Sequence, residues 1–307
     1  MSLSRGRTAL VSGLLVAVVT VATACDRKET TSTPTTTSAA APYFANWPHE
    51  ADQFRFHWTA ATGIDLSTGP SVAVRAYLES MRLAAFVGGD PDATYPGFLH
   101  ATPENTKQAT NTGDLYQLQY VRPKTRAEYE SGGLKYIQRP VFGYQPTHIL
   151  ALDPVANGYR ATVCIGAYSV YRTADDDPRK YFSTIADEKT GSLPYGDTEE
   201  IQIWRVELVE NDPRALDAPA TPTIPQTGPL PAPVDDVFGH WFITGSSGTG
   251  LWGPVGSSEQ IDTPEVRQQC AAAMPDDAAA RTAMATGFHT TPPPHGEAIP
   301  GWPAESK

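Results

Sequence analysis

The sequence lacks the short motifs that identify most metal, nucleotide and hydrolase sites. It contains no HExxH, no CxxC, no P-loop and no GxSxG pattern. Its seven histidines are scattered, and no two of them have the spacing of metal ligands. We therefore predict no metal ion, no cofactor and no catalytic residue from motif content.

Charged residues are also scarce, and acidic residues outnumber basic ones. Charged residues make up 19% of the 307 residues, and the formal net charge is −11. An acidic surface of this kind disfavours nucleic acid and anionic lipid headgroups as direct partners. The hydrophobic fraction of 40% is enough for a core, while 28 prolines and 25 glycines predict many turns.

The N-terminus has the pattern of a secretory signal peptide over residues 1–24. Arg5 and Arg7 precede an uncharged stretch that contains the apolar run "ALVSGLLVAVV". This run is slightly shorter than the roughly 18 or more apolar residues of a comfortable membrane span. Cleavage is favoured, and an uncleaved anchor is the alternative.

The sequence "ATAC" places Cys25 directly after a small-x-small cleavage pattern. It resembles the lipobox of bacterial lipoproteins, although Ala22 stands where that motif usually has Leu. The resemblance implies cleavage between Ala24 and Cys25 and a diacylglycerol on the Cys25 thiol, with acyl chains such as palmitate in the cell membrane. Ordinary signal cleavage without lipidation is the alternative.

Residues 25–42 form the lipidated cysteine and a tether rich in Thr and Pro. The segment "TTSTPTTTS" has no apolar residue to bury and cannot offset the entropy cost of folding. A flexible coil of this length spans about 20 to 25 Å. Its composition resembles the glycosylated stalks of exported actinobacterial lipoproteins, and a plain unmodified linker is the alternative.

The chain after the tether begins with a strand and a helix. "FRFHW" alternates, so that Phe54, Phe56 and Trp58 share a face of an edge segment; an exposed aromatic binding patch is the alternative. The next segment, "TGPSVAVRAYLESMRLAAFVGG", repeats apolar residues at helical spacing. Pro70 suits the first helical position, and Gly88 ends the helix.

Strands dominate the remainder of the domain. Alternating or continuous apolar patterns predict strands at 115–121, 147–153, 158–173, 199–210 and 236–245. Their spacing favours antiparallel pairing. Seven prolines over 213–233 predict an extended loop, and "TPEVRQQCAAAM" predicts a short helix capped by Thr263. Residues 275–307 are expected to form a largely disordered tail.

Two cysteines remain once Cys25 is set aside. Cys164 lies in the longest predicted strand, and Cys270 lies on the short helix. An exported protein with two such cysteines is expected to join them in a disulfide, closing a loop of about 106 residues. Two buried free thiols that pack as small hydrophobic groups are the alternative.

Three further segments contain residue types that occur in catalytic or ligand sites. His240 follows Asp235 and Asp236, and a His near an Asp can act as a general base. The glycine-rich "GSSGTG" at 245–250 and the acidic "ADDDPRKYF" at 174–182 lack the contexts of a phosphate cradle and of a calcium loop. We interpret these two as a flexible loop and a solvated hairpin tip.

One helix with "VRAYLESMRLAAFVGGD", followed by strands that end in "EEIQIWRVELVE" and "HWFITG", resembles the nuclear-transport-factor-2-like (cystatin-like) fold. The resemblance covers residues 66–245. It implies an α+β domain at 43–274 with a curved antiparallel sheet, packed on a long N-terminal helix, around a cone-shaped pocket. The Pro-rich insert and the aromatic N-terminal segment are additions to that fold.

The whole chain resembles the cell-envelope lipoproteins of mycobacteria and their relatives. This implies a protein that is lipid-anchored through Cys25 at the extracytoplasmic face of the cell membrane. We favour a non-catalytic domain that binds an envelope protein or a small apolar ligand. The alternatives are an enzyme with a pocket His/Asp pair and a structural or phage-exclusion surface protein, since one fold serves many functions.

Overall fold

A computed structural model of the chain describes residues 47–107, 109–133, 138–196, 199–215 and 217–304. The predicted signal peptide, Cys25 and the tether lie outside the described residues. The described residues belong to one compact unit, Ala41–Lys307. The rest of the structural account concerns this unit.

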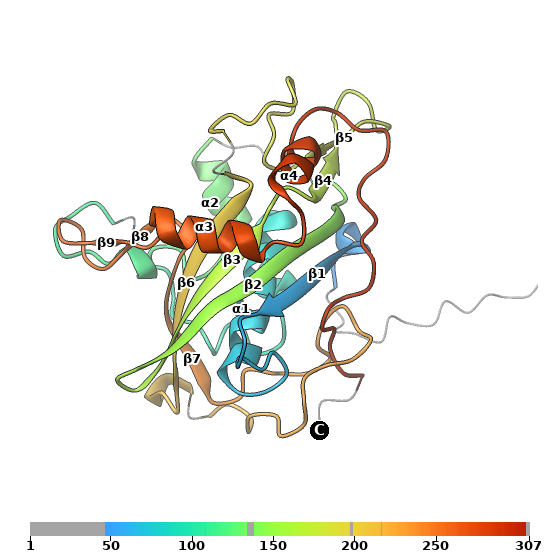
Figure 1. The fold of residues 1–307 in the computed structure, drawn as a ribbon. Coiled ribbons are helices and arrows are strands. Elements are labelled where there is room, and N and C mark those ends of the chain that lie inside the picture. The colour runs from blue at the N-terminus through green and yellow to red at the C-terminus, as the bar shows by residue number, and fades with distance from the viewer. Residues whose placement is uncertain (1–46, 108, 134–137, 197–198, 216, 305–307) are drawn as a thin grey trace, which may run out of the picture. The chain divides into compact units, whose positions relative to one another are not determined.

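A strongly curved sheet of seven strands, shown in Figure 1, organises the domain. Its order is β5-β4-β2-β3-β6-β7, and these neighbours pair antiparallel, while β1 pairs with β2 in parallel. The strands are β1 (Gln53–Ala60), β2 (Phe142–Val155), β3 (Gly158–Gly166), β4 (Val170–Thr173), β5 (Tyr181–Ser183), β6 (Ile201–Glu210) and β7 (Trp241–Ser247). A separate pair joins β8 (Leu251–Trp252) to β9 (Glu259–Gln260). The predicted α+β class with a curved antiparallel sheet is confirmed.

Helix α1 (Pro70–Phe86) packs on the concave face of the sheet and forms the main core with it. Pro70 occupies the first turn, as the sequence predicts, because its missing N–H has no helical partner there. The alternation in β1 buries Phe54, Phe56 and Trp58 against this helix, as expected. Because β1 precedes α1, the helix follows a strand and is not the first element of the domain.

Two shorter helices lie toward the C-terminus. Helix α3 (Pro264–Ala273) crosses the convex face of the sheet, where Cys270 and Met274 join a second cluster with Cys164. Thr263 caps it as predicted, its hydroxyl accepting a hydrogen bond from the Val266 N–H. Helix α4 (Ala278–Ala285) follows after a short turn, and α2 (Arg126–Ser131) lies earlier in the chain.

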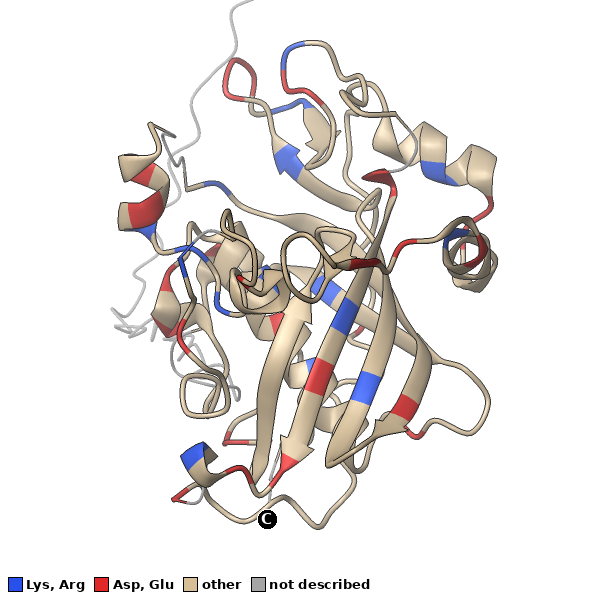
Figure 2. Cartoon of the chain, turned by 90° about the vertical axis from the view of Figure 1, so that its left-hand side faces the viewer, with Lys and Arg blue, Asp and Glu red and all other residues tan. Residues whose placement is uncertain are grey.

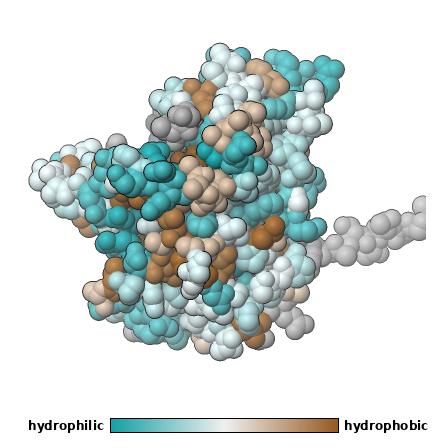
Figure 3. Space-filling model, viewed as in Figure 1, coloured by the Kyte–Doolittle hydropathy of each residue, from teal (hydrophilic) through white to brown (hydrophobic). Residues whose placement is uncertain are grey.

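The convex face carries both charge and apolar surface. Figure 2 shows basic and acidic residues on neighbouring strands of the sheet. One ion pair between neighbouring strands joins Arg160 of β3 to Glu207 of β6. Figure 3 shows a hydrophobic patch on the same side as α3. A shallow hollow there, of about 640 Å³, is lined by Leu150, Ala151, Thr162, Val266, Gln269, Ala272 and Ala273.

Three predicted strands differ from those observed. Residues 115–121 form no strand but a short 3-10 helix (Tyr116–Leu118), and the bridge from Leu115 leads to Pro254, a residue outside the strands. The strand predicted at 158–173 is two strands, since the chain turns after Gly166. A Cβ at Gly166 would stand 2.6 Å from the Pro146 ring, so only glycine fits. The last predicted strand, 236–245, begins only at Trp241.

The prediction that residues 275–307 form a largely disordered tail is wrong for the described part, 275–304. This segment contains α4 and then runs across the domain, forming bridges from His289 to Tyr181, from Ile299 to His57 and from Trp302 to Leu230. Trp302 is 1% exposed and belongs to the main core. The tail is ordered by these long-range contacts, although its sequence has little regular periodicity of its own.

The Pro-rich segment 213–233 is a loop in its described part, as predicted. After a 3-10 turn (Pro213–Ala215) it contains no strand among the described residues. It is nevertheless anchored: Leu230 exchanges two backbone hydrogen bonds with Trp302, and Gln226 is buried. The loop and the C-terminal segment therefore hold each other at one end of the core.

Candidate functional site

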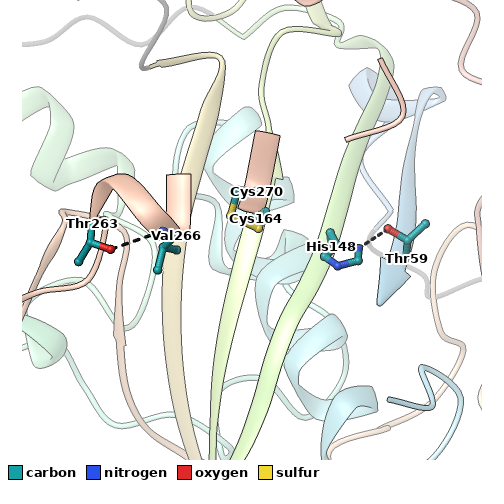
Figure 4. The surroundings of a disulfide bond; sticks show 6 residues. All are labelled: Thr59, His148, Cys164, Thr263, Val266 and Cys270. Atoms are coloured by element: carbon teal, nitrogen blue, oxygen red, sulfur yellow. Dashed lines mark hydrogen bonds between the residues drawn. A yellow bond between two sulfur atoms is a disulfide. The ribbon is translucent and has the colours of Figure 1, made fainter. Parts of the chain in front are cut away.

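The two cysteines of the domain form the predicted disulfide. Figure 4 shows Cys164 on β3 facing Cys270 on α3, and their Cα atoms are 5.4 Å apart. Both cysteines are fully buried. The bond ties the helix on the convex face to a central strand. The other predicted site residues, Ala24 and Cys25, lie outside the described residues.

The structure does not pair His240 with Asp236. The Asp236 carboxylate lies instead 3.3 Å from His100 Nε2, and it also accepts hydrogen bonds from the backbone N–H groups of Phe238 and Gly239. Burial raises the pKa of the Asp236 carboxyl, and the nearby His100 opposes that rise. Since the carboxylate is used to hold the turn before β7, this His/Asp contact is a structural one.

The most deeply buried charges lie at the end of the core where the tail docks. The Glu79 carboxylate of α1 accepts hydrogen bonds from Trp58 Nε1 (2.7 Å), Tyr95 Oη (2.7 Å) and Trp302 Nε1 (2.9 Å). Burial raises the pKa of Glu79, while the nearby charge of Arg75 and these three donors oppose the rise. With both oxygens of the Glu79 carboxylate engaged by these donors, the cluster serves the fold.

A groove between α1 and the concave face of the sheet is a candidate binding site with aromatic walls. It has a volume of about 330 Å³, which lies at the small end of the range for ligand pockets. We call it the α1 groove. It is lined by Met81, Arg82 and Ala85 of α1, Tyr120, Arg122, Pro123 and Lys124 of the following segment, Tyr129 of α2 and Trp204 of β6.

Aromatic rings form much of the wall of the α1 groove. Trp204 alternates onto the concave face with Val206 and Leu208, as the sequence of β6 predicts. Tyr120 and Trp204 also line a second hollow of about 200 Å³, next to Gly248. A Cβ on Gly248 would lie 2.3 Å from the Trp204 ring, so this glycine lets the backbone approach the indole.

Arg82 brings a positive charge into the α1 groove. Its Nε and Nη1 atoms donate to two amide oxygens of the concave face, Gln145 Oε1 (3.2 Å) and Gln202 Oε1 (3.3 Å). Burial lowers the pKa of Arg82 to about 10; the nearby Tyr129 opposes this shift, and Arg172 adds a smaller lowering effect. Arg82 is therefore still a cation at neutral pH.

Sequence reasoning missed the α1 groove because its parts come from three separate regions. Tyr120 was assigned to a strand at 115–121, and Arg82 only to a helix. One signal was available: α1 carries Arg75, Glu79 and Arg82 at helical spacing on the side next to that of Val74 and Leu78. In a helix that packs on a sheet, charged residues beside the apolar side belong either to a buried hydrogen-bond network or to a binding site. Helix α1 has both, the Glu79 cluster and the α1 groove.

Comparison of the chain with protein-family models, with curated proteins and with solved structures finds no match. Among the described residues no group of three or more His, Cys, Asp or Glu side chains is arranged to hold a metal ion. No helix in the described part of the chain has the length and apolar character needed to cross a bilayer. The resemblance to the nuclear-transport-factor-2-like family stays a prediction.

Proposed function

We propose that this protein is a lipid-anchored, extracytoplasmic lipoprotein whose domain binds a small, largely apolar ligand without transforming it. Cys25 would carry the lipid, residues 26–42 would form the tether, and the α1 groove would take the ligand. The observation that carries the proposal is the groove itself, an aromatic-walled space between α1 and the concave face of the sheet. Such concave sites with few polar groups are typical of ligand pockets.

The disulfide supports the proposed location. Disulfides persist in oxidising compartments outside the cytoplasm and are rare inside it. The bond between Cys164 and Cys270 therefore agrees with export directed by residues 1–24. With these two cysteines joined, Cys25 is the remaining cysteine of the chain and is free to accept a lipid.

Replacing Cys25 tests the anchor. We expect Cys25→Ser to move the protein from the membrane fraction to the soluble fraction, because a hydroxyl at this position is no substrate for thioether lipidation. Loss of two acyl chains removes about 0.8 kcal/mol of membrane affinity per buried CH2 group. The measurement is fractionation of cells that express the full chain, followed by immunoblotting and intact-mass analysis.

Ser38→Ala, a neutral change in the same tether, is the matched control and should stay in the membrane fraction. If Cys25→Ser also stays there, the anchor is the uncleaved apolar run and not a lipid. That result would overturn the lipoprotein assignment and leave the proposal for the groove intact.

Filling the α1 groove tests the binding role. We expect Ala85→Leu to weaken binding of N-phenyl-1-naphthylamine, a neutral aromatic fluorophore, by about tenfold or more, because the added side chain occupies the space of the ligand. Ala127→Leu, on the exposed surface of α2, adds the same atoms outside the groove and should leave binding unchanged. Fluorescence titration of the full chain measures both, and equal affinities in the two variants would contradict the proposal.

A further inference from the structure

Arg82 is a partly buried cation whose described neighbours supply no balancing anion. Its hydrogen-bond partners are the neutral amides of Gln145 and Gln202, and its guanidinium carbon lies 5.2 Å from the centre of the Phe86 ring. Within the described ranges no Asp or Glu pairs with it, and the like charge of Arg172 acts against it. Burying a charge without a counter-charge is costly, so a fold seldom retains one without a use.

The rim of the α1 groove adds further positive charge. The Lys124 ammonium lies 4.7 Å from the centre of the Tyr120 ring. The Arg122 guanidinium donates hydrogen bonds to the backbone carbonyl oxygens of Leu99 and Thr102. The Glu128 carboxylate accepts hydrogen bonds from the N–H and hydroxyl of Thr125, which lower its pKa, and the charge of Lys124 lowers that pKa a little further. The groove is thus a cationic spot on a chain whose net charge is −11.

Two buried donors near Arg82 have no acceptor in the described structure. Gln145 Nε2 belongs to the amide whose oxygen accepts from Arg82, and Trp204 Nε1 belongs to the groove wall. A buried N–H without an acceptor destabilises a fold, and such groups are satisfied in most proteins by water or a ligand. A ligand that carries negative charge and accepts hydrogen bonds would therefore complement both the Arg82 cation and these two donors.

We propose that the α1 groove binds a small organic monoanion, a carboxylate or sulfonate attached to a flat apolar group. The anion would lie against Arg82, and the flat group would lie between the rings of Tyr120, Tyr129 and Trp204. A single charge fits better than a polyanion, because the acidic surface repels extended negative charge while Arg82 acts only at short range. This inference rests on the proposed function and adds the chemical class of the ligand.

A matched pair of probes tests the inference. 1-Anilinonaphthalene-8-sulfonate and N-phenyl-1-naphthylamine share one aromatic framework and differ by the sulfonate. In the full chain carrying Cys25→Ser, which has no acyl chain to compete, we expect the sulfonate to bind about tenfold more tightly or better, as charge-assisted hydrogen bonds provide. Fluorescence titration measures both affinities, and Ala85→Leu should weaken both, which places the probes in the groove.

The preference must depend on Arg82. Arg82→Met should bring the affinity for the sulfonate down to that for the neutral probe and leave the neutral probe within about twofold. Arg126→Gln removes the same charge from α2 at a solvent-exposed ion pair with Glu130 and should leave both affinities unchanged. If Arg82→Met does not fold, Arg82→Gln and the salt dependence of sulfonate binding to the parent chain, which should weaken as salt rises, provide the same test.

The outcomes separate the two proposals. Equal affinity for both probes in the parent chain, or a sulfonate preference that survives loss of Arg82, would overturn the anion inference and leave the binding role standing. Failure of both probes to bind, or binding that Ala85→Leu does not change, would overturn the binding role together with the inference.

Discussion

Replacing Trp302 by Ala is expected to lower the free energy of unfolding by about 3 to 5 kcal/mol, a large effect for a residue five positions before Lys307. The indole is 1% exposed, and the Arg75 guanidinium carbon lies 4.2 Å from its ring centre. Its N–H is also one of the three donors to the buried Glu79 carboxylate. The substitution therefore leaves a cavity and weakens the solvation of a buried charge.

Urea-induced unfolding of the full chain measures the effect, with Ile299→Ala as the matched control. Ile299 lies in the same segment but is 51% exposed, so its loss should change stability by no more than about 0.5 kcal/mol. Trp302→Phe should fall between the two, since it fills most of the cavity but cannot donate to Glu79. Equal, small effects of Trp302→Ala and Ile299→Ala would contradict the assignment of the tail to the core.

The Glu79 cluster also explains why the tail could not be predicted from sequence. Trp302 and Glu79 are 223 positions apart, and the segment around Trp302 has the proline and glycine content of a disordered end. Its order comes from three-dimensional neighbours: the Arg75 guanidinium donates to the carbonyl oxygens of Gln226 and Pro300. No local pattern encodes a contact of this kind.

Local signals, by contrast, predicted several elements well. Pro70 and Thr263 mark the starts of α1 and α3 because a proline or a capping hydroxyl satisfies the geometry of a helix N-terminus whatever the tertiary structure. Alternation identified β1 and β6, since each has one face on the core. The same rule failed at 115–121, where alternating residues find no strand to pair with and instead bring Tyr120 to the α1 groove.

For the α1 groove, the sequence predicts only that a pocket exists, through the cone-shaped pocket that the resemblance implies, and not which residues line it. Its chemistry depends on which side chains of α1 and the sheet meet, and the sequence does not reveal that Arg82 faces the amides of Gln145 and Gln202. A charged residue in a helix is usually interpreted as solvent-facing. Only the packing of α1 between the sheet and the segment at 120–129 turns Arg82 into a site residue.

Removing the disulfide is expected to lower the free energy of unfolding by about 4 kcal/mol. The bond closes a loop of 106 residues, and the loss of unfolded-state entropy on closing so long a loop is large. The double variant Cys164→Ala with Cys270→Ala removes the bond without leaving a buried thiol or hydroxyl. Urea-induced unfolding of this variant and of the parent chain, each with and without dithiothreitol, measures the difference.

Dithiothreitol should shift the unfolding of the parent chain and leave that of the double variant unchanged. Because both cysteines are fully buried, reduction in the absence of urea should be slow, and it should become fast only where unfolding exposes the bond. Titration of two free thiols from these positions in the unreduced, unfolded parent chain would instead contradict the disulfide.

The loss should not be spread evenly over the fold, because α3 depends on the disulfide more than any strand does. Cys270 is the only buried residue of that helix, and a shallow hollow of about 640 Å³ separates part of it from β2 and β3. A ten-residue helix with so little buried surface is marginal without an anchor.

Hydrogen exchange in the double variant should therefore speed up first at the amides of α3, while those of α1, buried in the main core, remain protected until global unfolding. Equal acceleration in α1 and α3 would mean that the bond acts only through the unfolded chain, and that the convex face holds α3 by packing alone.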